Sequence, residues 1–294
     1  MAISRHFTTH LAEQLSAIHQ RPVQLTSVSP ISGGDINEAY CLHTNTGKYM
    51  MKLNSKQAYP GMFACESEGL NAIQSTQTIA VPEVVLQSDF EQDSYLILEW
   101  IDATHATPAT SRKLGEQLAA MHRHTAGQFG FHQDNYMGSL PQSNRKHDTW
   151  RSFFIEERLQ PMVQRALNKR LLQNAEANQF EQLYLHLGDW FEEEVPALIH
   201  GDLWGGNYLI GADGKPYLID PAVSYGHREF DLAMTTLFGG YSREFYEGYQ
   251  NTFPLAQDWE QRSHLWNLYP LLLHLNLFGL GYLSRVKDCL KKYV

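Results

Sequence analysis

The chain has 294 residues, of which 43% are hydrophobic and 19% are charged, and its formal net charge is −9. This composition is typical of a folded protein large enough for two lobes, and it excludes an intrinsically disordered chain. The negative charge argues against general nucleic-acid binding, which requires a basic face.

The first third of the chain predicts a helix followed by a small antiparallel sheet. Apolar residues recur at helical spacing over residues 4–20, and the pattern then changes to that of strands. We expect one further helix inserted before the fourth strand, and this small lobe is predicted to span residues 1–101. The predicted strands lie near residues 23–31, 36–43, 49–53, 83–88 and 94–101, and the inserted helix covers residues 64–77.

Three features of this lobe fit the phosphates of a nucleotide, although each has an ordinary structural alternative. Gly33-Gly34 lies between two strands, where the backbone could approach phosphates closely or simply form a turn. Lys52 ends the third strand and could neutralise the α- and β-phosphates, or be a solvated lysine. Glu68, in the following helix, is the predicted partner of Lys52. Glu66 points about 200° away from Glu68, so only one of the two can face the lysine.

The sheet ends at the crossing into the second lobe. Backbone groups of Glu99, Trp100, Ile101 and Asp102 are the expected partners of adenine, with Trp100 and Ile101 flanking the ring. A plain edge strand is the alternative. A catalytic and substrate-binding lobe is predicted over residues 102–294, with helices at 110–124, 148–174, 178–194, 228–250 and 258–290.

The most informative stretch of the chain is His200-Gly201-Asp202-Leu203-Trp204-Gly205-Gly206-Asn207, which is followed by a second acid, Asp220. An Asp, an Asn five residues later and an Asp after the next hairpin form the phosphoryl-transfer pattern of kinase-like folds. In this interpretation Asp202 accepts the proton of the attacking hydroxyl, and Asn207 and Asp220 bind Mg²⁺. A hairpin closed at residues 211–215 brings Asn207 and Asp220 together at its open end. An ordinary surface hairpin with polar ends is the alternative.

Three further residues are assigned around this loop. Asp231 could cap a helix, and in kinase-like folds an acid at this place also anchors the catalytic loop. His200 is assigned a bracing role, since Asp202 suffices as the proton acceptor. Trp204 could line the acceptor pocket or be a core aromatic.

With these residues in place, the chain resembles the fructosamine kinase (ketosamine-3-kinase) family, a branch of the aminoglycoside-phosphotransferase and protein-kinase-like superfamily. Residues 200–207 look like the family pattern HGDLWxGN, and residues 220–234 look like DPA…YGHRExDLAM. Residues 129–142 resemble FGFxxDNxxGxxPQ, and residues 275–279 resemble a motif of the C-terminal helix. The likeness covers nearly the whole chain. The segments outside the DxxxxN loop separate this branch from choline and aminoglycoside kinases.

The resemblance implies a bilobal α+β protein-kinase-like fold, with a small antiparallel sheet and one key helix in the first lobe and a catalytic hairpin in the larger helical lobe. It also implies an ATP- and Mg²⁺-dependent transferase that phosphorylates a sugar hydroxyl, on the third carbon, of ketosamines such as ribulosamine, erythrulosamine or fructosamine. In the family the adduct then decomposes and frees the amine, which is deglycation repair.

The resemblance further marks residues on the acceptor side. Asp134, Asn135, Trp204 and His227 are the expected contacts to a ketosamine, whether small or protein-bound. Asp35 stands where some relatives have a cysteine in the Gly-rich loop, so a redox switch is not expected there.

Two other functions stay open. One is a small-molecule kinase with a different acceptor, namely an aminoglycoside, an amino alcohol or a free sugar. The other is a catalytically inactive nucleotide-binding protein.

The surroundings of the protein are predicted more simply. Three widely spaced cysteines indicate a reducing cytoplasm. The apolar stretch at residues 265–283 carries polar groups that would be costly in lipid, so we expect a buried helix and no membrane partner. A monomer is favoured, although the sequence leaves the oligomeric state open.

Overall fold

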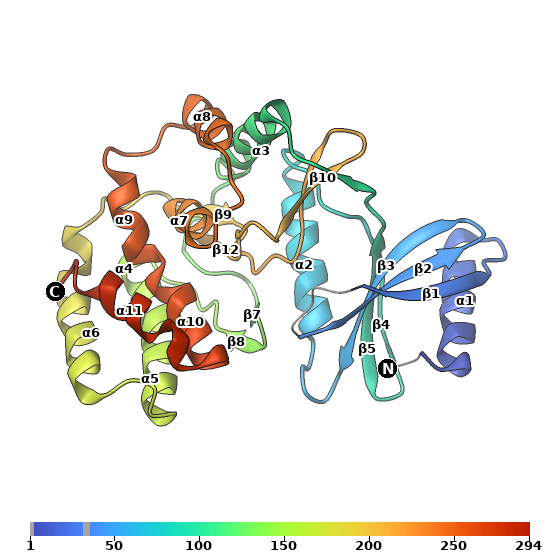
Figure 1. The fold of residues 1–294 in the computed structure, drawn as a ribbon, viewed down its shortest axis with the longest axis horizontal. Helices are drawn as coiled ribbons and strands as arrows, with labels where there is room; N and C mark the ends of the chain where they lie inside the picture. The colour runs from blue at the N-terminus through green and yellow to red at the C-terminus, as the bar shows by residue number, and fades with distance from the viewer. Residues whose placement is uncertain (1–2, 32–35) are drawn as a thin grey trace. The chain divides into compact units, whose positions relative to one another are not determined.

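The computed structural model describes residues 3–31 and 36–294, which fall into two compact units (Figure 1). The first unit comprises Met1–Asn71 and Pro82–Asp102, and the second comprises Ala72–Val81 and Ala103–Val294. The division after Asp102 lies one residue beyond the predicted boundary. The assignment of residues 72–81 to the second unit was not predicted. Gly33, Gly34 and Asp35 of the predicted phosphate loop lie outside the described residues.

A five-stranded antiparallel sheet with strand order β1-β2-β3-β5-β4 forms the centre of the first unit. Alternation along β3 assigns its two faces, because successive side chains of a strand point to opposite sides. Tyr49 and Met51 pack with α1 in an apolar core, whereas Lys52 and Asn54 contact α2. The elements are α1 (Arg5–His19), β1 (Leu25–Ile31), β2 (Glu38–Thr44), β3 (Gly47–Ser55), α2 (Met62–Ser75), β4 (Val84–Phe90) and β5 (Asp93–Glu99).

The second unit is mainly helical, with three small antiparallel sheets. Its helices are α3 (Pro108–Met121), α4 (Trp150–Phe153), the π-helix η1 (Phe154–Leu159), α5 (Gln160–Asn168), α6 (Asn174–His186), the 3₁₀-helix η2 (Leu187–Asp189), α7 (Glu229–Leu237), α8 (Arg243–Thr252), α9 (Trp259–Trp266), α10 (Leu268–Phe278), the 3₁₀-helix η3 (Leu280–Tyr282) and α11 (Leu283–Leu290). Its strands are β6 (Ala103–Thr104), β7 (Asn135–Met137), β8 (Leu140–Gln142), β9 (Ala197–Ile199), β10 (Tyr208–Gly211), β11 (Pro216–Leu218) and β12 (Ser224–Gly226).

Several helices that the periodicity predicts as single segments are divided in the structure. The segment at 228–250 is interrupted between α7 and α8, where Gly239 and Gly240 have φ values of +75° and +100°. Gly279, with φ +85°, ends α10. These left-handed conformations suit glycine and end a helix. The helical spacing of apolar residues therefore continues along the sequence although the backbone changes direction.

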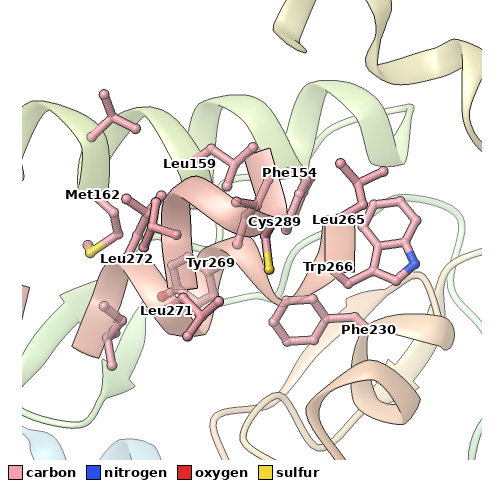
Figure 2. Close-up of a cluster of buried hydrophobic side chains, with 14 of the residues drawn as sticks. Phe154, Leu159, Met162, Phe230, Leu265, Trp266, Tyr269, Leu271, Leu272 and Cys289 are labelled. Carbon is pink, nitrogen blue, oxygen red and sulfur yellow. The ribbon is translucent and has the colours of Figure 1, made fainter. Parts of the chain in front are cut away.

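One large apolar cluster holds the helices of the second unit together. Figure 2 shows the side chains of α10 and neighbouring elements meeting in it, among them Phe154, Trp266, Tyr269 and Leu272. The predicted burial of the apolar stretch at 265–283 is confirmed for α10, where most residues are buried. Among the residues that the structure describes, no helix is long and apolar enough to cross a membrane.

Two short antiparallel pairs frame the segment that carries the predicted catalytic residues. β9 pairs with β12, and β10 pairs with β11. The predicted hairpin is therefore confirmed, with its turn closed by a hydrogen bond from the Gly211 amide to the Lys215 carbonyl at 2.9 Å. Because β9 leads into residue 200 and β12 follows residue 223, these two pairs hold the loop at 200–207 beside the segment at 219–223.

Candidate active site

The open end of the β10–β11 hairpin brings Asn207 beside the segment that contains Asp220. The Ile219 amide donates to the Asn207 carbonyl at 3.0 Å. A second link is the hydrogen bond from the Ala222 amide to the His200 carbonyl at 2.9 Å. The spacing of the two residues in the sequence thus becomes proximity in the fold.

Asn207 is buried and bonds directly to Asp202. Its Nδ2 donates to the main-chain oxygen of Asp202 at 2.8 Å and to the carboxylate Oδ2 at 3.0 Å. Since Nδ2 makes these bonds, Oδ1 is the atom of Asn207 that can ligate a cation. An amide oxygen beside the carboxylate of Asp220 is a donor set that suits a hard cation such as Mg²⁺.

Asp220 has a left-handed backbone conformation, with φ +56°. Such a conformation is uncommon for a residue with a side chain, and it is found where the surrounding structure enforces it. The carboxylate of Asp220 also acts on Asp202. Desolvation, and next the negative charge of Asp220, raise the pKa of the Asp202 carboxyl to about 7. A proton acceptor with a pKa near the working pH is suited to general-base catalysis.

A buried polar network that includes Asp231 anchors the loop at residues 200–207. The amides of His200 and Gly201 donate to the two carboxylate oxygens of Asp231 at 2.7 and 2.9 Å, so Asp231 occupies the anchoring place that the resemblance implies. Asp231 lies in the first turn of α7 and is not its cap, because the helix begins at Glu229. His122 reaches Asp231 Oδ2 at 3.1 Å, and its other ring nitrogen lies 2.8 Å from the hydroxyl of Tyr249.

His122 belongs to this network but is not among the candidate residues identified from the sequence. Its side chain is completely buried. A signal was available, because His122 follows the buried residues Leu114 and Leu118 at intervals of four along one helical face. Its partner Asp231, however, is more than a hundred residues away and could not be identified from local spacing.

His200 braces the loop through both ring nitrogens. Its Nδ1 accepts from the Asp202 amide at 3.2 Å, and its Nε2 donates to the Ile219 carbonyl at 2.9 Å. Burial lowers the pKa of His200, which keeps the ring neutral with one donor and one acceptor. The imidazole therefore connects Asp202 to the segment at 219–220.

Close backbone packing requires glycine at position 201, whereas a side chain at position 206 would have to displace the Trp204 ring. Gly201 has φ +82°, and a Cβ placed on it would lie 2.1 Å from the Ala222 carbonyl oxygen. A Cβ on Gly206 would lie 2.2 Å from the ring of Trp204. The Trp204 side chain covers the loop while remaining 42% exposed, and its ring meets that of Phe238 edge-on. The alternative of a core aromatic is therefore wrong for Trp204.

Two of the four predicted acceptor contacts are corrected by burial. His227 is 2% exposed, stacks on Trp266, and uses one nitrogen toward the Glu192 carbonyl and the other to accept from the Glu229 amide. Asn135 is 6% exposed, and both ends of its amide bond to other parts of the protein. Neither side chain is therefore available to contact a substrate. Their place in a motif did not reveal whether they face solvent.

Asp134 and Trp204 keep their acceptor-side assignment as predictions. Asp134 is exposed, and its Oδ1 accepts from the Asn144 amide at 2.8 Å, which fixes one side of the carboxylate.

In the first unit, the structure pairs Lys52 with Glu66, and the choice of Glu68 is corrected. Lys52 Nζ lies 2.6 Å from Glu66 Oε1, and both side chains are almost buried. Glu66 lies four residues after Met62 and four before Leu70, which are both buried, so it shares the inward face of α2. That stripe of apolar residues was the signal that separates Glu66 from Glu68.

The segment predicted to receive adenine follows β5. The Glu99 amide donates to the Glu83 carbonyl at 2.9 Å, and the Glu99 carboxylate accepts from the Glu83 amide at 3.3 Å. Asp102 accepts from the Trp100 indole at 2.8 Å and lies 3.5 Å from Lys48 Nζ. The segment is thus ordered at its two ends by contacts within the first unit.

Comparison with known proteins finds one matching family. The family model described as fructosamine kinase matches residues 7–294. A relative named "probable ketoamine kinase" from Synechocystis is 40% identical, over 96% of this chain and 95% of that protein. The rice "protein-ribulosamine 3-kinase, chloroplastic" is 34% identical over 93% of this chain and 80% of that protein.

Solved structures agree in fold. A "putative fructosamine-3-kinase" from Thermobifida fusca has a TM-score of 0.86 at 33% identity, over 96% of this chain and 97% of that one. The aminoglycoside phosphotransferase APH(4)-Ia has a TM-score of 0.65 at 14% identity, over 97% of this chain and 98% of that one. The second likeness concerns the fold alone, and together the two confirm the predicted protein-kinase-like class.

Proposed function

Because the chain belongs to the fructosamine kinase family, we propose that it is an ATP-dependent kinase that phosphorylates a sugar hydroxyl of ketosamines. The observation that carries this proposal is the bond between the Asn207 amide and the Asp202 carboxylate, beside the hairpin that leads to Asp220. This arrangement provides a proton acceptor and oxygen ligands within one short segment, as phosphoryl transfer requires.

In this function Asp202 accepts the proton of the attacking hydroxyl, and Asn207 and Asp220 would hold Mg²⁺. When bound there, the ion would supply positive charge beside the phosphates of ATP. Lys52, held by Glu66, neutralises further phosphate charge, and residues 99–102 receive the adenine through their backbone. Positioning and charge neutralisation supply most of the rate, since little covalent chemistry is required of the protein.

The proposed acceptor is the sugar of an amine-linked ketose, phosphorylated on its third carbon. Ribulosamine, erythrulosamine and fructosamine derivatives are the candidate substrates, and release of the amine afterwards would make the reaction a repair of glycation. The exposed ring of Trp204, two residues from Asp202, offers a flat apolar wall for a sugar. Asp134 offers a carboxylate that could accept from sugar hydroxyls or from the substrate ammonium.

An acceptor panel tests the proposal. The purified protein is incubated with Mg·ATP and, separately, with ribulosamine, erythrulosamine and fructosamine derivatives of one small amine, an aminoglycoside, an amino alcohol and free ribulose. We expect kcat/KM to be highest for one of the ketosamines. A higher value for the aminoglycoside or the amino alcohol would assign the chain to another acceptor class, and no ATP consumption with any acceptor would indicate an inactive protein.

We further propose that the protein works as a monomer in the cytoplasm. Cys41 and Cys289 are free thiols, and both are buried. Two buried thiols that are not joined in disulfides suit a reducing compartment.

A further inference from the structure

A chain of buried hydrogen bonds connects helix α10 to the segment that follows Asp220. The Tyr269 hydroxyl donates to Gln142 Oε1 at 2.6 Å. Gln142 Nε2 donates to Asn135 Oδ1 at 2.8 Å, and Asn135 Nδ2 donates to the Val223 carbonyl at 2.9 Å. Every donor points the same way, so each bond in the series polarises the next.

This series of hydrogen bonds is completely buried. Tyr269, Gln142 and Asn135 are 1%, 4% and 6% exposed, so none of them is available to a substrate. Asn135 and Gln142 stand directly opposite each other in the β7–β8 pair. Tyr269 comes from the apolar core shown in Figure 2. A buried polar series of this kind is costly unless every member is bonded, which makes it specific for one arrangement.

A buried arginine holds the two residues that follow Gln142, the middle member of the series. The Arg158 guanidinium donates to the Ser143 carbonyl at 2.6 Å and to Asn144 Oδ1 at 2.7 Å. It also lies 5.6 Å from the ring centre of Tyr269. The residues after β8 are therefore fixed to η1 and to α10 at the same point.

At its other end, the series reaches a segment whose conformation has to be enforced. Asp220 has φ +56°, and neighbouring backbone groups on both sides of it are held. His200 Nε2 donates to the Ile219 carbonyl at 2.9 Å, before Asp220, and Asn135 holds the Val223 carbonyl after it.

We propose that the series Tyr269–Gln142–Asn135 is a positioning device for Asp220, which fixes the carboxylate as a ligand of the Mg²⁺ that accompanies the nucleotide. The three residues are positioning residues and act through the Val223 carbonyl. This inference rests on the proposed function only in taking Asp220 as a metal ligand, and it can be tested without phosphate transfer.

The test compares ADP binding with and without Mg²⁺ by calorimetry, in the wild type and in Asn135→Ala. We expect the Kd of ADP in the presence of Mg²⁺ to rise about 5- to 10-fold, as for loss of one buried hydrogen bond. The Kd of ADP without metal should be unchanged. Tyr269→Phe removes only the first donor of the series. It should shift the Mg²⁺-dependent Kd in the same direction by about 2-fold or more, and it keeps the test decisive if Asn135→Ala does not fold.

Asn276→Ala is the matched control. Asn276 is a buried asparagine that likewise donates to backbone carbonyls, those of Met162 and Leu272, both at 2.9 Å. It should lower Tm and leave both Kd values unchanged. The proposal is overturned if Asn135→Ala and Tyr269→Phe lower Tm as the control does but leave the Mg²⁺-dependent Kd at the wild-type value. A wild type that binds Mg·ADP but phosphorylates no ketosamine would instead contradict the proposed function alone.

Discussion

Asp202 receives both of its contacts to Asn207 from a single amide, at 2.8 Å to the main chain and 3.0 Å to the carboxylate. This amide therefore fixes the orientation of the carboxylate as well as the path of the loop. At the scale of single residues, the geometry around Asp202 depends on side chains that each make more than one hydrogen bond, namely Asn207 and His200.

Replacement of Asp202 by Asn removes the proposed proton acceptor and keeps the size of the side chain. We expect kcat to fall by about 10²–10⁴-fold, the range for loss of a general base. ADP should bind with nearly the wild-type Kd. Steady-state kinetics and calorimetry measure the two effects, and a fully active Asp202→Asn variant would show that the base is a different group.

Glu66→Gln tests the corrected partner of Lys52. The variant keeps an acceptor oxygen but removes the negative charge, and a hydrogen bond to a charged group is worth about 1.5–3 kcal/mol, so we expect a loss of up to about 10- to 100-fold in kcat/KM for ATP. Glu68→Gln removes the same charge from another side of the same helix and is the matched comparison. An effect of Glu68→Gln equal to or larger than that of Glu66→Gln would restore Glu68 as the functional acid.

At the scale of elements, α3 and α8 approach so closely that glycine is required at their contact. A Cβ on Gly115 would lie 2.0 Å from the Phe245 carbonyl oxygen, and one on Gly248 would lie 2.2 Å from that of Arg112. The contact between α3 and α8 affects the site through two residues. His122, which follows α3, contacts Asp231, and Tyr249 of α8 contacts His122.

Gly248→Ala should therefore destabilise the protein by about 1–3 kcal/mol, the usual cost of overpacking. Gly127→Ala is the control, since a Cβ there has no atom within 4 Å. Urea denaturation followed by fluorescence measures both variants. Equal free energies of unfolding for the two would contradict the close contact between α3 and α8.

How far the sequence could predict this site depends on whether the information is local. The spacing of Asp202, Asn207 and Asp220 within one loop and hairpin was sufficient to place all three, and alternation placed the strands of the first unit. Spacing alone does not distinguish Glu66 from Glu68, because the distinction lies in the buried residues Met62 and Leu70 on the same face of α2 as Glu66. The role of His122 could not be predicted because its partner is distant in the chain. The assignment of His227 to the acceptor side is wrong because a motif does not indicate whether a side chain is buried.

At the scale of the whole molecule, buried histidines make stability depend on pH. Burial lowers the pKa of His227, although the carboxylates of Glu229 and Glu194 act in the opposite direction and Arg228 adds to the lowering. A histidine that is neutral in the fold takes up a proton on unfolding once the pH falls below its unfolded pKa of about 6.5. Its contribution to stability is therefore complete above that pH and decreases as the pH falls toward the folded pKa.

The variant His227→Gln isolates this effect. Its loss of stability relative to the wild type should be larger at about pH 7.5 than at about pH 5.5, by up to roughly 1.4 kcal/mol per pH unit below 6.5. Urea denaturation at the two pH values measures it. Leu183→Ala, at a buried position without a titratable group, should show the same difference at both. A difference for His227→Gln that grows as the pH falls would contradict a neutral buried imidazole.

We propose that this chain transfers the terminal phosphate of ATP to the third-carbon hydroxyl of a ketosamine. The most direct measurement is ³¹P and ¹³C nuclear magnetic resonance of the product formed from Mg·ATP and a ribulosamine derivative. We predict a phosphate monoester whose phosphorus couples to the third carbon of the sugar. A phosphate on another carbon would contradict this proposal. So would a ribulosamine that stays unmodified while an aminoglycoside or amino alcohol is phosphorylated.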